Sequence, residues 1–310
     1  MKIRMIAVRG VLLFLVGLGL FPVTLPAADL PKSHRIVLIA EDPAYFGAKE
    51  NDKNWMRGYI GEAVKRLADP AAKPRVVGID FKFPPLPEAN HGLQKLLAGL
   101  SAVRNAGVPV VLGTSEMLET AAGKDADPRL RSVARFGCIK IHFGDANLFA
   151  GRMFFPYYAN IDGFNPGCGV PYSLSAAIVR AGCKDDAGVD ARIRRGLIQV
   201  KRSRLLTWFA ERRSRIFAGH DHNVPVIYPA YIPISRIPTI KLQDLHDGKF
   251  DKRLTQGSFV LFGMVATKGG EEVDRHPFTT PTDCSVKELP GVYDHLFGMA
   301  TMLRVLEGDR

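Results

Sequence analysis

"RIVLIAED" at residues 35–42 and "PRVVGIDFKF" at residues 74–83 are two short apolar runs with several β-branched side chains. Runs of this length and composition predict buried strands. Between them, apolar residues recur at helical spacing from Asn54 to Leu67, which predicts an amphipathic helix. A strand, a helix and a second strand in this order predict two parallel strands joined by a helical crossover.

The same alternation continues along the chain. Residues 93–107 predict a second helix, and Gly107 is a residue type that favours helix C-termini. "VPVVLGTSE" at residues 108–116 and the run from Ser258 to Val265 predict two further strands, and Val292 to Leu306 predicts an amphipathic closing helix. We therefore expect an α/β fold with a mainly parallel central sheet and helices on both of its faces.

The middle of the chain is less regular. "FGCIKIHFG" at residues 136–144 and "GRMFFPYYA" at residues 151–159 predict strands, and a hairpin between them is one arrangement. A helix is expected to begin near Ser173, whereas residues 184–215 are charged and predict a solvated face. This part is predicted to be an irregular, β-containing insertion within a single domain that spans residues 29–310.

Residues 1–28 combine a basic start with an uncharged stretch that begins at Gly10. The densest apolar part, Val11 to Leu20, has the length of a signal-peptide core and is short for a full membrane span. We expect either a signal peptide or an N-terminal membrane anchor; a buried helix of a cytosolic protein is the remaining alternative. The first two place the domain in the bacterial periplasm or on the outer face of the cytoplasmic membrane.

The chain carries 42 basic and 31 acidic side chains, a formal net charge of +11. Such an excess could favour anionic surfaces such as lipid headgroups, polysaccharide or nucleic acid. The sequence contains no basic motif interleaved with aromatic residues of the kind found in nucleic-acid-binding modules. We therefore expect no nucleic-acid partner.

The four cysteines, Cys138, Cys168, Cys183 and Cys284, form no C-x-x-C pair, so the signal for a zinc site is weak. In an oxidising compartment they could form up to two disulfides, with three connectivities open. Isolated buried thiols are the alternative.

Three acidic residues are expected at strand ends: Asp42, Asp80 and Asp274, the last with His276 two residues further on. Ligands of open parallel sheets bind outside the carboxyl ends of the strands, so these four residues are candidates for ligand binding. Three hypotheses stay open. The residues could bind a ligand at the strand ends, three of them (Asp80, Asp274 and His276) could form a metal-assisted hydrolase, or they could only cap loops and helices. No motif in the sequence indicates a particular cofactor, and whether the protein binds a metal stays open.

Seven segments resemble, in order, the second type of the CHASE family, a sensory extracellular domain associated with cyclases and histidine kinases. They are "IVLIAEDP", "VVGIDFKF", "VPVVLG", "IPTIKLQDL", "GSFVLFGMVA", "DRHPFTTP" and "LPGVYDHLFGMATML", within residues 35–306. The family's G-I-D matches Gly78, Ile79 and Asp80, and its P-G-V-x-x-H matches Pro290, Gly291, Val292 and His295. Its D-x-H-x-T-P matches Asp274, His276, Thr280 and Pro281 with one extra residue. Its acidic central turn is only partly kept, at Asn147, Gly151, Arg152 and Pro156.

The resemblance implies an exported or membrane-anchored, non-catalytic domain that binds an unknown small-molecule or envelope signal. Family members usually continue into transmembrane helices and a cytoplasmic output module, whereas this sequence stops at Arg310. We therefore expect a separate membrane kinase or cyclase to supply the output, with the metal-assisted hydrolase as the alternative function.

Overall fold

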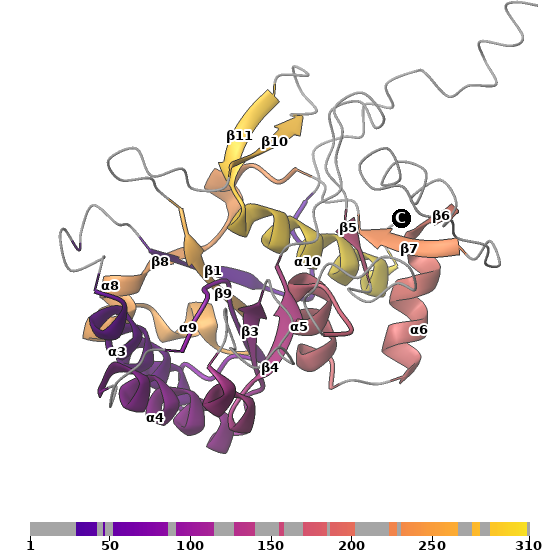
Figure 1. Ribbon diagram of the computed structural model, residues 1–310. Helices are drawn as coiled ribbons and strands as arrows, with labels where there is room; N and C mark the ends of the chain where they lie inside the picture. Colours follow the sequence, from indigo (N-terminus) through magenta and orange to yellow (C-terminus); the bar gives the residue numbers. More distant parts are fainter. Residues whose placement is uncertain are drawn as a thin grey trace, which may run out of the picture.

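A six-stranded sheet forms the centre of the computed structural model (Figure 1). Its strands lie in the order β4-β3-β2-β9-β1-β8, and every neighbouring pair is parallel. The strands are β1 (Ile36–Glu41), β2 (Val76–Ile79), β3 (Val110–Thr114), β4 (Arg135–Cys138), β8 (Thr239–Lys241) and β9 (Phe259–Met264). The predicted α/β fold class is confirmed.

The structure describes the following residues: 29–41, 46, 52–85, 91–114, 127–139, 155–157, 170–184, 187–201, 223–227, 231–265, 275–279 and 286–308. Within them, the predicted strands and helices around the central sheet occur at the expected places. The second strand is shorter than predicted, because the pairing of β2 stops at Ile79. Asp80 therefore directly follows the strand.

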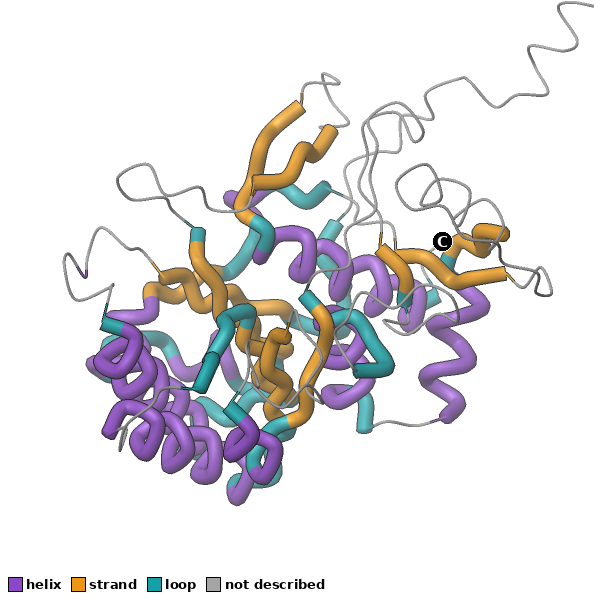
Figure 2. The backbone as a smooth tube through the Cα atoms, viewed as in Figure 1, coloured by secondary structure: helices purple, strands orange, loops and turns teal. Residues whose placement is uncertain are grey.

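Helices cover both faces of the sheet, as predicted (Figure 2). One face carries α3 (Lys53–Lys65), α4 (His91–Asn105) and α8 (Leu242–Asp247); the other carries α5 (Leu174–Gly182), α6 (Ala187–Gly196) and α10 (Val292–Glu307). Successive strand residues point to opposite faces. In β1, Val37 and Ile39 therefore enter the α3–α4 core, while Ile36 and Leu38 enter the α5–α10 core.

Short elements complete the central region. They are η2 (Arg66–Ala68), η3 (Pro128–Ser132), η4 (Ile234–Arg236) and α9 (Lys252–Thr255). Local sequence fixes several helix ends: the Asp52 side chain accepts from the first amides of α3, and Ser173 does the same for α5. Gly107, just beyond α4, has a φ of 78°, a left-handed conformation that glycine adopts at no steric cost.

Glycines bring α3 and α4 unusually close together. A Cβ atom on Gly61 would lie 2.5 Å from the carbonyl oxygen of Lys95 and 2.6 Å from Cα of Leu96. A Cβ on Gly99 would collide with the carbonyl group of Gly61. The two helix backbones are therefore in direct contact at positions that no larger residue could occupy without a shift.

Two smaller sheets lie outside the central one. The first contains β5 (Phe155–Pro156), β6 (Ile198–Lys201) and β7 (Asn223–Ile227), and agrees with the predicted β-containing insertion. Only the outer ends of the predicted hairpin between residues 136–144 and 151–159 are described: β4 pairs with β3 and β5 pairs with β7, and the rest of the predicted hairpin lies outside the described residues. The second is the antiparallel pair β10 (Arg275–Thr279) and β11 (Val286–Pro290), which projects from the body (Figure 2).

Glu307, at the end of α10, joins the last helix to the start of the first strand. Its carboxylate accepts hydrogen bonds from the backbone N–H groups of Lys32 at 2.8 Å and Ser33 at 2.7 Å. Nδ1 of His34 lies 2.9 Å from the same carboxylate. Because His34 leads into β1, α10 ends at the edge of the sheet where the strands begin.

Candidate functional site

The chain changes direction at the carboxyl edge of the sheet, the edge where the parallel strands end. β9 lies between β2 and β1. The helices that follow β1 and β2 cover one face, whereas α10, which follows β9, covers the other. In open α/β sheets, ligands bind at such a switch point, outside the carboxyl ends of the strands.

Asp80 directly follows β2 at this edge; the sequence predicted its position at a strand end, but not the strand order that makes the switch point. Its backbone N–H donates to the carbonyl of Phe262 in β9 at 2.9 Å. Its carboxylate Oδ1 lies 3.8 Å from Nε2 of His295, in the first turn of α10, and the two side chains are 14% and 5% exposed. Asp80 and His295 are therefore close enough for an ion pair when the imidazole is protonated.

Ser175 of α5 fixes the other side of the His295 ring. Its Oγ donates to the His295 carbonyl at 3.1 Å and lies 3.3 Å from Nδ1. A hydroxyl has a single proton, so with that proton on the carbonyl bond, Nδ1–H is the donor to Oγ. In the neutral ring Nε2 then carries no proton and faces Asp80. A second proton on Nε2 would convert this contact into an imidazolium–carboxylate pair.

This arrangement contains the residue types of a hydrolytic triad but not its geometry. Ser175 is fully buried, and its proton is donated to a backbone carbonyl. The Asp80–His295 distance of 3.8 Å exceeds hydrogen-bond range. Ser175 therefore orients the imidazole and cannot reach an external substrate.

Several further polar residues are buried at or near the carboxyl edge. Glu41 is the last residue of β1, Thr114 is the last of β3, and Asp294 precedes His295; each is at most 2% exposed. Burying carboxylates is costly unless other groups compensate them. The sheet therefore ends in a polar, ionisable layer instead of an extension of its apolar core.

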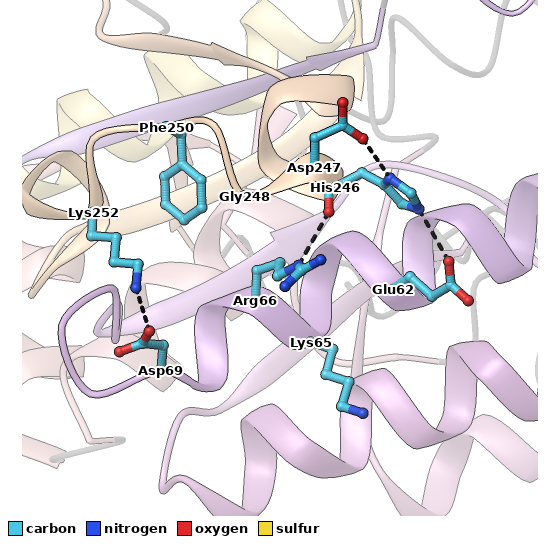
Figure 3. Close-up of a pocket in the computed structure, with 9 residues that line it drawn as sticks. All are labelled: Glu62, Lys65, Arg66, Asp69, His246, Asp247, Gly248, Phe250 and Lys252. Carbon is cyan, nitrogen blue, oxygen red and sulfur yellow. Dashed lines mark hydrogen bonds and ion pairs between the residues drawn. The ribbon is translucent and has the colours of Figure 1, made fainter.

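A separate hollow lies on the flank of α3, near its C-terminal end (Figure 3). It has a volume of about 630 Å³ and is lined by Glu62, Lys65, Arg66, Asp69, His246, Asp247, Gly248, Phe250 and Lys252. Among the described residues that line it, none was predicted from the sequence as a site residue. A second hollow of about 430 Å³ adjoins it and shares Glu62 and His246.

Ionisable side chains in contact with one another line the larger hollow. The two ring nitrogens of His246 lie 3.0 Å from Glu62 Oε2 and from Asp247 Oδ1 (Figure 3). The same ring stacks on Tyr59 with centroids 4.0 Å apart. Hydrogen bonds from Lys95 and His246 lower the pKa of Glu62, and those from His246 and Lys249 lower that of Asp247. The hydrogen bond between His246 of α8 and Glu62 of α3 therefore links these two helices.

Comparison with known families identifies the chain. The model of the CHASE2 domain matches residues 7–310, essentially the whole sequence. The chain belongs to the CHASE2 family. This is a family of extracellular sensory domains, which typically sit in proteins with signalling output domains. No curated protein and no solved structure matched the chain.

The structure of this CHASE2 domain brings two separate family motifs into contact. The G-I-D motif covers the end of β2 and Asp80 directly after it, and P-G-V-x-x-H joins β11 to α10 with His295 in the first turn. The sequence interpretation chose Asp80 but left His295 out of the candidate site; only its place in the family motif marked it. Ser175 had no signal, because a serine among small residues in a helix resembles ordinary packing.

The other predicted site residues are only partly placed. Asp42 and Asp274 lie outside the described residues. His276 belongs to β10, where it is opposite Leu289, but its side chain is not described. In the described part of the CHASE2 domain, no group of three His, Cys, Asp or Glu side chains is placed to hold a metal ion. The hydrolase of Asp80, Asp274 and His276 stays a prediction.

The cysteines are in different states. Cys138, at the end of β4, is disulfide-bonded, whereas Cys183, after α5, is a free thiol whose pKa is raised by burial. Cys168 and Cys284 lie outside the described residues. With Cys183 free, the four cysteines can form one intrachain disulfide at most, fewer than the two that the sequence allowed.

Among the helices of the CHASE2 domain that the structure describes, none has both the length and the apolarity to cross a membrane. The predicted leader or anchor, residues 1–28, lies outside the described residues. Its role therefore stays a prediction.

Proposed function

We propose that the protein is an exported or membrane-anchored sensor that binds a small-molecule or envelope signal at the carboxyl edge of the sheet. The contact between Asp80 and His295 carries this proposal. It joins two family motifs that are far apart in the sequence, at the place where α/β folds bind ligands. Asp42, Asp274 and His276 are further candidates, because they are expected to follow the same strand ends.

The proposed signal path runs along α10. His295 is in the first turn of this helix, and Glu307 at its other end binds the segment that leads into β1. A helix of 16 residues spans about 24 Å, so α10 connects the crevice with the opposite edge of the sheet. A ligand that changes the position of His295 would thereby move Glu307 and its partners. A separate membrane kinase or cyclase is the proposed receiver.

The proposed location is the periplasm or the outer face of the cytoplasmic membrane. Residues 1–28 supply the signal peptide or anchor, and a disulfide at Cys138 suits an oxidising compartment. A reporter that is active only in the periplasm, fused after Arg310, should be active. Activity of a cytosol-specific reporter at the same position would contradict the location.

Ligand binding is tested on the exported full chain. Native mass spectrometry is expected to detect a retained small molecule, and Asp80→Asn and His295→Gln are expected to release it while melting within a few degrees of the unsubstituted protein. Lys73→Gln, an exposed charge change before β2 and therefore at the opposite edge of the sheet, serves as the control and should retain the molecule. Unchanged retention in both site variants, or equal loss in all three, would contradict binding at this edge.

A further inference from the structure

Arg57 is a buried cation in the second turn of α3. Only 2% of the residue is exposed. Its Nη2 donates to the carbonyl of Pro84, in the segment after β2. Its Nη1 is also buried and has no hydrogen-bond partner in the described part of the chain. A buried charged donor without a partner is destabilising, so its presence requires an explanation.

Neighbouring charges compensate Arg57 only in part. The carboxylate of Asp127 attracts the Arg57 guanidinium electrostatically. The same carboxylate accepts hydrogen bonds from the Arg129 side chain at 2.8 and 2.6 Å and from the Arg129 backbone N–H at 3.0 Å. Two guanidinium groups therefore share one carboxylate, which leaves one positive charge in excess. Burial is the main cause that lowers the pKa of Arg57, but a guanidinium stays protonated at ordinary pH.

Arg57 also lies at the carboxyl edge. Pro84 is in the segment that follows β2, and Asp127, which precedes η3, donates its N–H to the carbonyl of Phe83 at 2.7 Å. The two helices α3 and α4 begin at this edge, where Asn54 Oδ1 accepts from the N–H of Gly92 at 2.7 Å. The positive ends of both helix dipoles therefore add to the potential around Arg57.

We propose that Arg57 binds an oxyanion group, a carboxylate or a phosphate, of the ligand that occupies the carboxyl-edge crevice. The inference rests on the proposed function and adds a ligand class, an anionic small molecule. Arg57 approaches from the α3–α4 side of the sheet, whereas Asp80 and His295 are on the α5–α10 side. A charged oxygen on Nη1 would satisfy the unpaired donor and offset the excess positive charge.

The test measures thermal stabilisation of the exported full chain by inorganic phosphate and by succinate, at an ionic strength held constant with chloride. At least one of the two anions is expected to raise the melting temperature with a saturable midpoint. Arg57→Met should weaken that response roughly tenfold to hundredfold, the loss expected for a hydrogen bond to a charged group. A response to phosphate alone indicates a phosphorylated ligand, and a response to succinate alone indicates a carboxylate ligand.

Lys65→Gln is the matched control, because it removes the same charge from an exposed position of the same helix. It should respond as the unsubstituted protein does. Methionine fills the site without a charge, so Arg57→Met is expected to fold. If it does not, Arg57→Lys provides the measurement: it keeps the charge without the planar fork and should give an intermediate midpoint. An equal response in all folded variants, or no response beyond chloride, would overturn the inference.

The inference and the proposed function can fail separately. If neither anion stabilises the protein while native mass spectrometry detects a retained neutral or cationic molecule, the sensor proposal stands and the anionic ligand class is wrong. If an anion binds through Arg57 but Asp80→Asn and His295→Gln have no effect on retention, the anion site stands and the proposed role of Asp80 and His295 is wrong.

Discussion

Asp80 and His295 face each other across the carboxyl edge of the sheet, 3.8 Å apart, and Ser175 contacts the opposite nitrogen of the same imidazole. Three elements from different parts of the chain, β2, α5 and α10, are thus joined at one ring. The position of this ring depends on all three elements. A displacement of the ring would therefore also affect α5 and α10, the two helices that hold it on this face.

The Ser175 hydroxyl is expected to contribute to stability as well as to orientation. Ser175→Ala removes the hydroxyl that contacts the buried Nδ1 and carbonyl of His295, which should lower the free energy of unfolding by about 1–3 kcal/mol. Ser132→Ala is the matched control: that hydroxyl also donates to a carbonyl, of Arg129 at 2.8 Å, but is exposed. Urea denaturation would measure both, and an equal effect of the two changes would contradict the role of Ser175.

The glycine contact between α3 and α4 gives a second prediction. Gly61→Ala places a methyl group against the backbone of α4 and should destabilise by about 1–3 kcal/mol, because both helices must move apart. Gly58→Ala meets mainly the flexible Cδ of Lys95 at 3.3 Å, and alanine favours the helix, so its effect should be small. The shift of the urea midpoint at unchanged slope distinguishes the two. A Gly61→Ala protein as stable as Gly58→Ala would show that the helices are not held by backbone contact.

The lowered pKa of Glu307 predicts that the stability of the protein depends on pH. Burial alone would raise its pKa, but hydrogen bonds from His34 and from the N–H groups of Lys32 and Ser33 outweigh burial, and the pKa of Glu307 is lowered. A carboxyl group whose pKa is lower in the folded than in the unfolded chain stabilises the folded state at pH values above the unfolded-state pKa, about 4.3 for glutamate. This stabilisation is lost as the pH falls through the folded-state pKa. Glu307→Gln should therefore cost about 2 kcal/mol above about pH 5 and progressively less below it.

The matched control for Glu307 is Asp29→Asn. Asp29 is in the same N-terminal segment and pairs with Arg236 at 2.6 Å, but its side chain is 79% exposed, so solvent screens the pair. Thermal unfolding from pH 3 to pH 8 should show a pH-dependent difference for Glu307→Gln and almost none for Asp29→Asn. A difference for Glu307→Gln that stays constant through acid pH would rule out the ionised carboxylate as its source.

The disulfide at Cys138 should be needed for full stability. Reduction, or Cys138→Ser, is expected to cost about 2–4 kcal/mol, the usual effect of opening a native cross-link. Cys183→Ser leaves the disulfide intact and should preserve the sensitivity to reductant. Peptide mapping under non-reducing conditions checks the cross-link directly. If Cys138 is recovered as a free thiol from the exported protein, the prediction is wrong.

The sequence predicted the elements of the sheet better than their arrangement. Runs such as Ile36–Glu41 and Phe259–Met264 are apolar enough to require burial on both faces, so local pattern identifies them as strands. The insertion of β9 between β2 and β1 depends on pairing between distant segments, which periodicity does not encode. The partners of β4 and β5 were not predicted for the same reason, since alternation identifies a strand but not its partner.

The candidate site was predicted only where strand ends reveal it. Asp80 follows an apolar run, and its position at the carboxyl edge is a consequence of parallel topology. Ser175 and Arg57 lie in helices, where a small polar residue or an arginine normally indicates packing or a solvated face. Their burial depends on how the helices approach the sheet, and that approach is set by tertiary contacts such as those of Gly61.

The contacts of Glu307 with Lys32 and Ser33 bring the beginning and the end of the folded domain together. The polypeptide enters and leaves this unit at neighbouring points, although the whole sheet lies between them in sequence. A unit with adjacent entry and exit can be inserted between two segments of another chain without forcing them apart. A domain with this connection can be exchanged between receptors, because the segments that flank it in each receptor stay side by side.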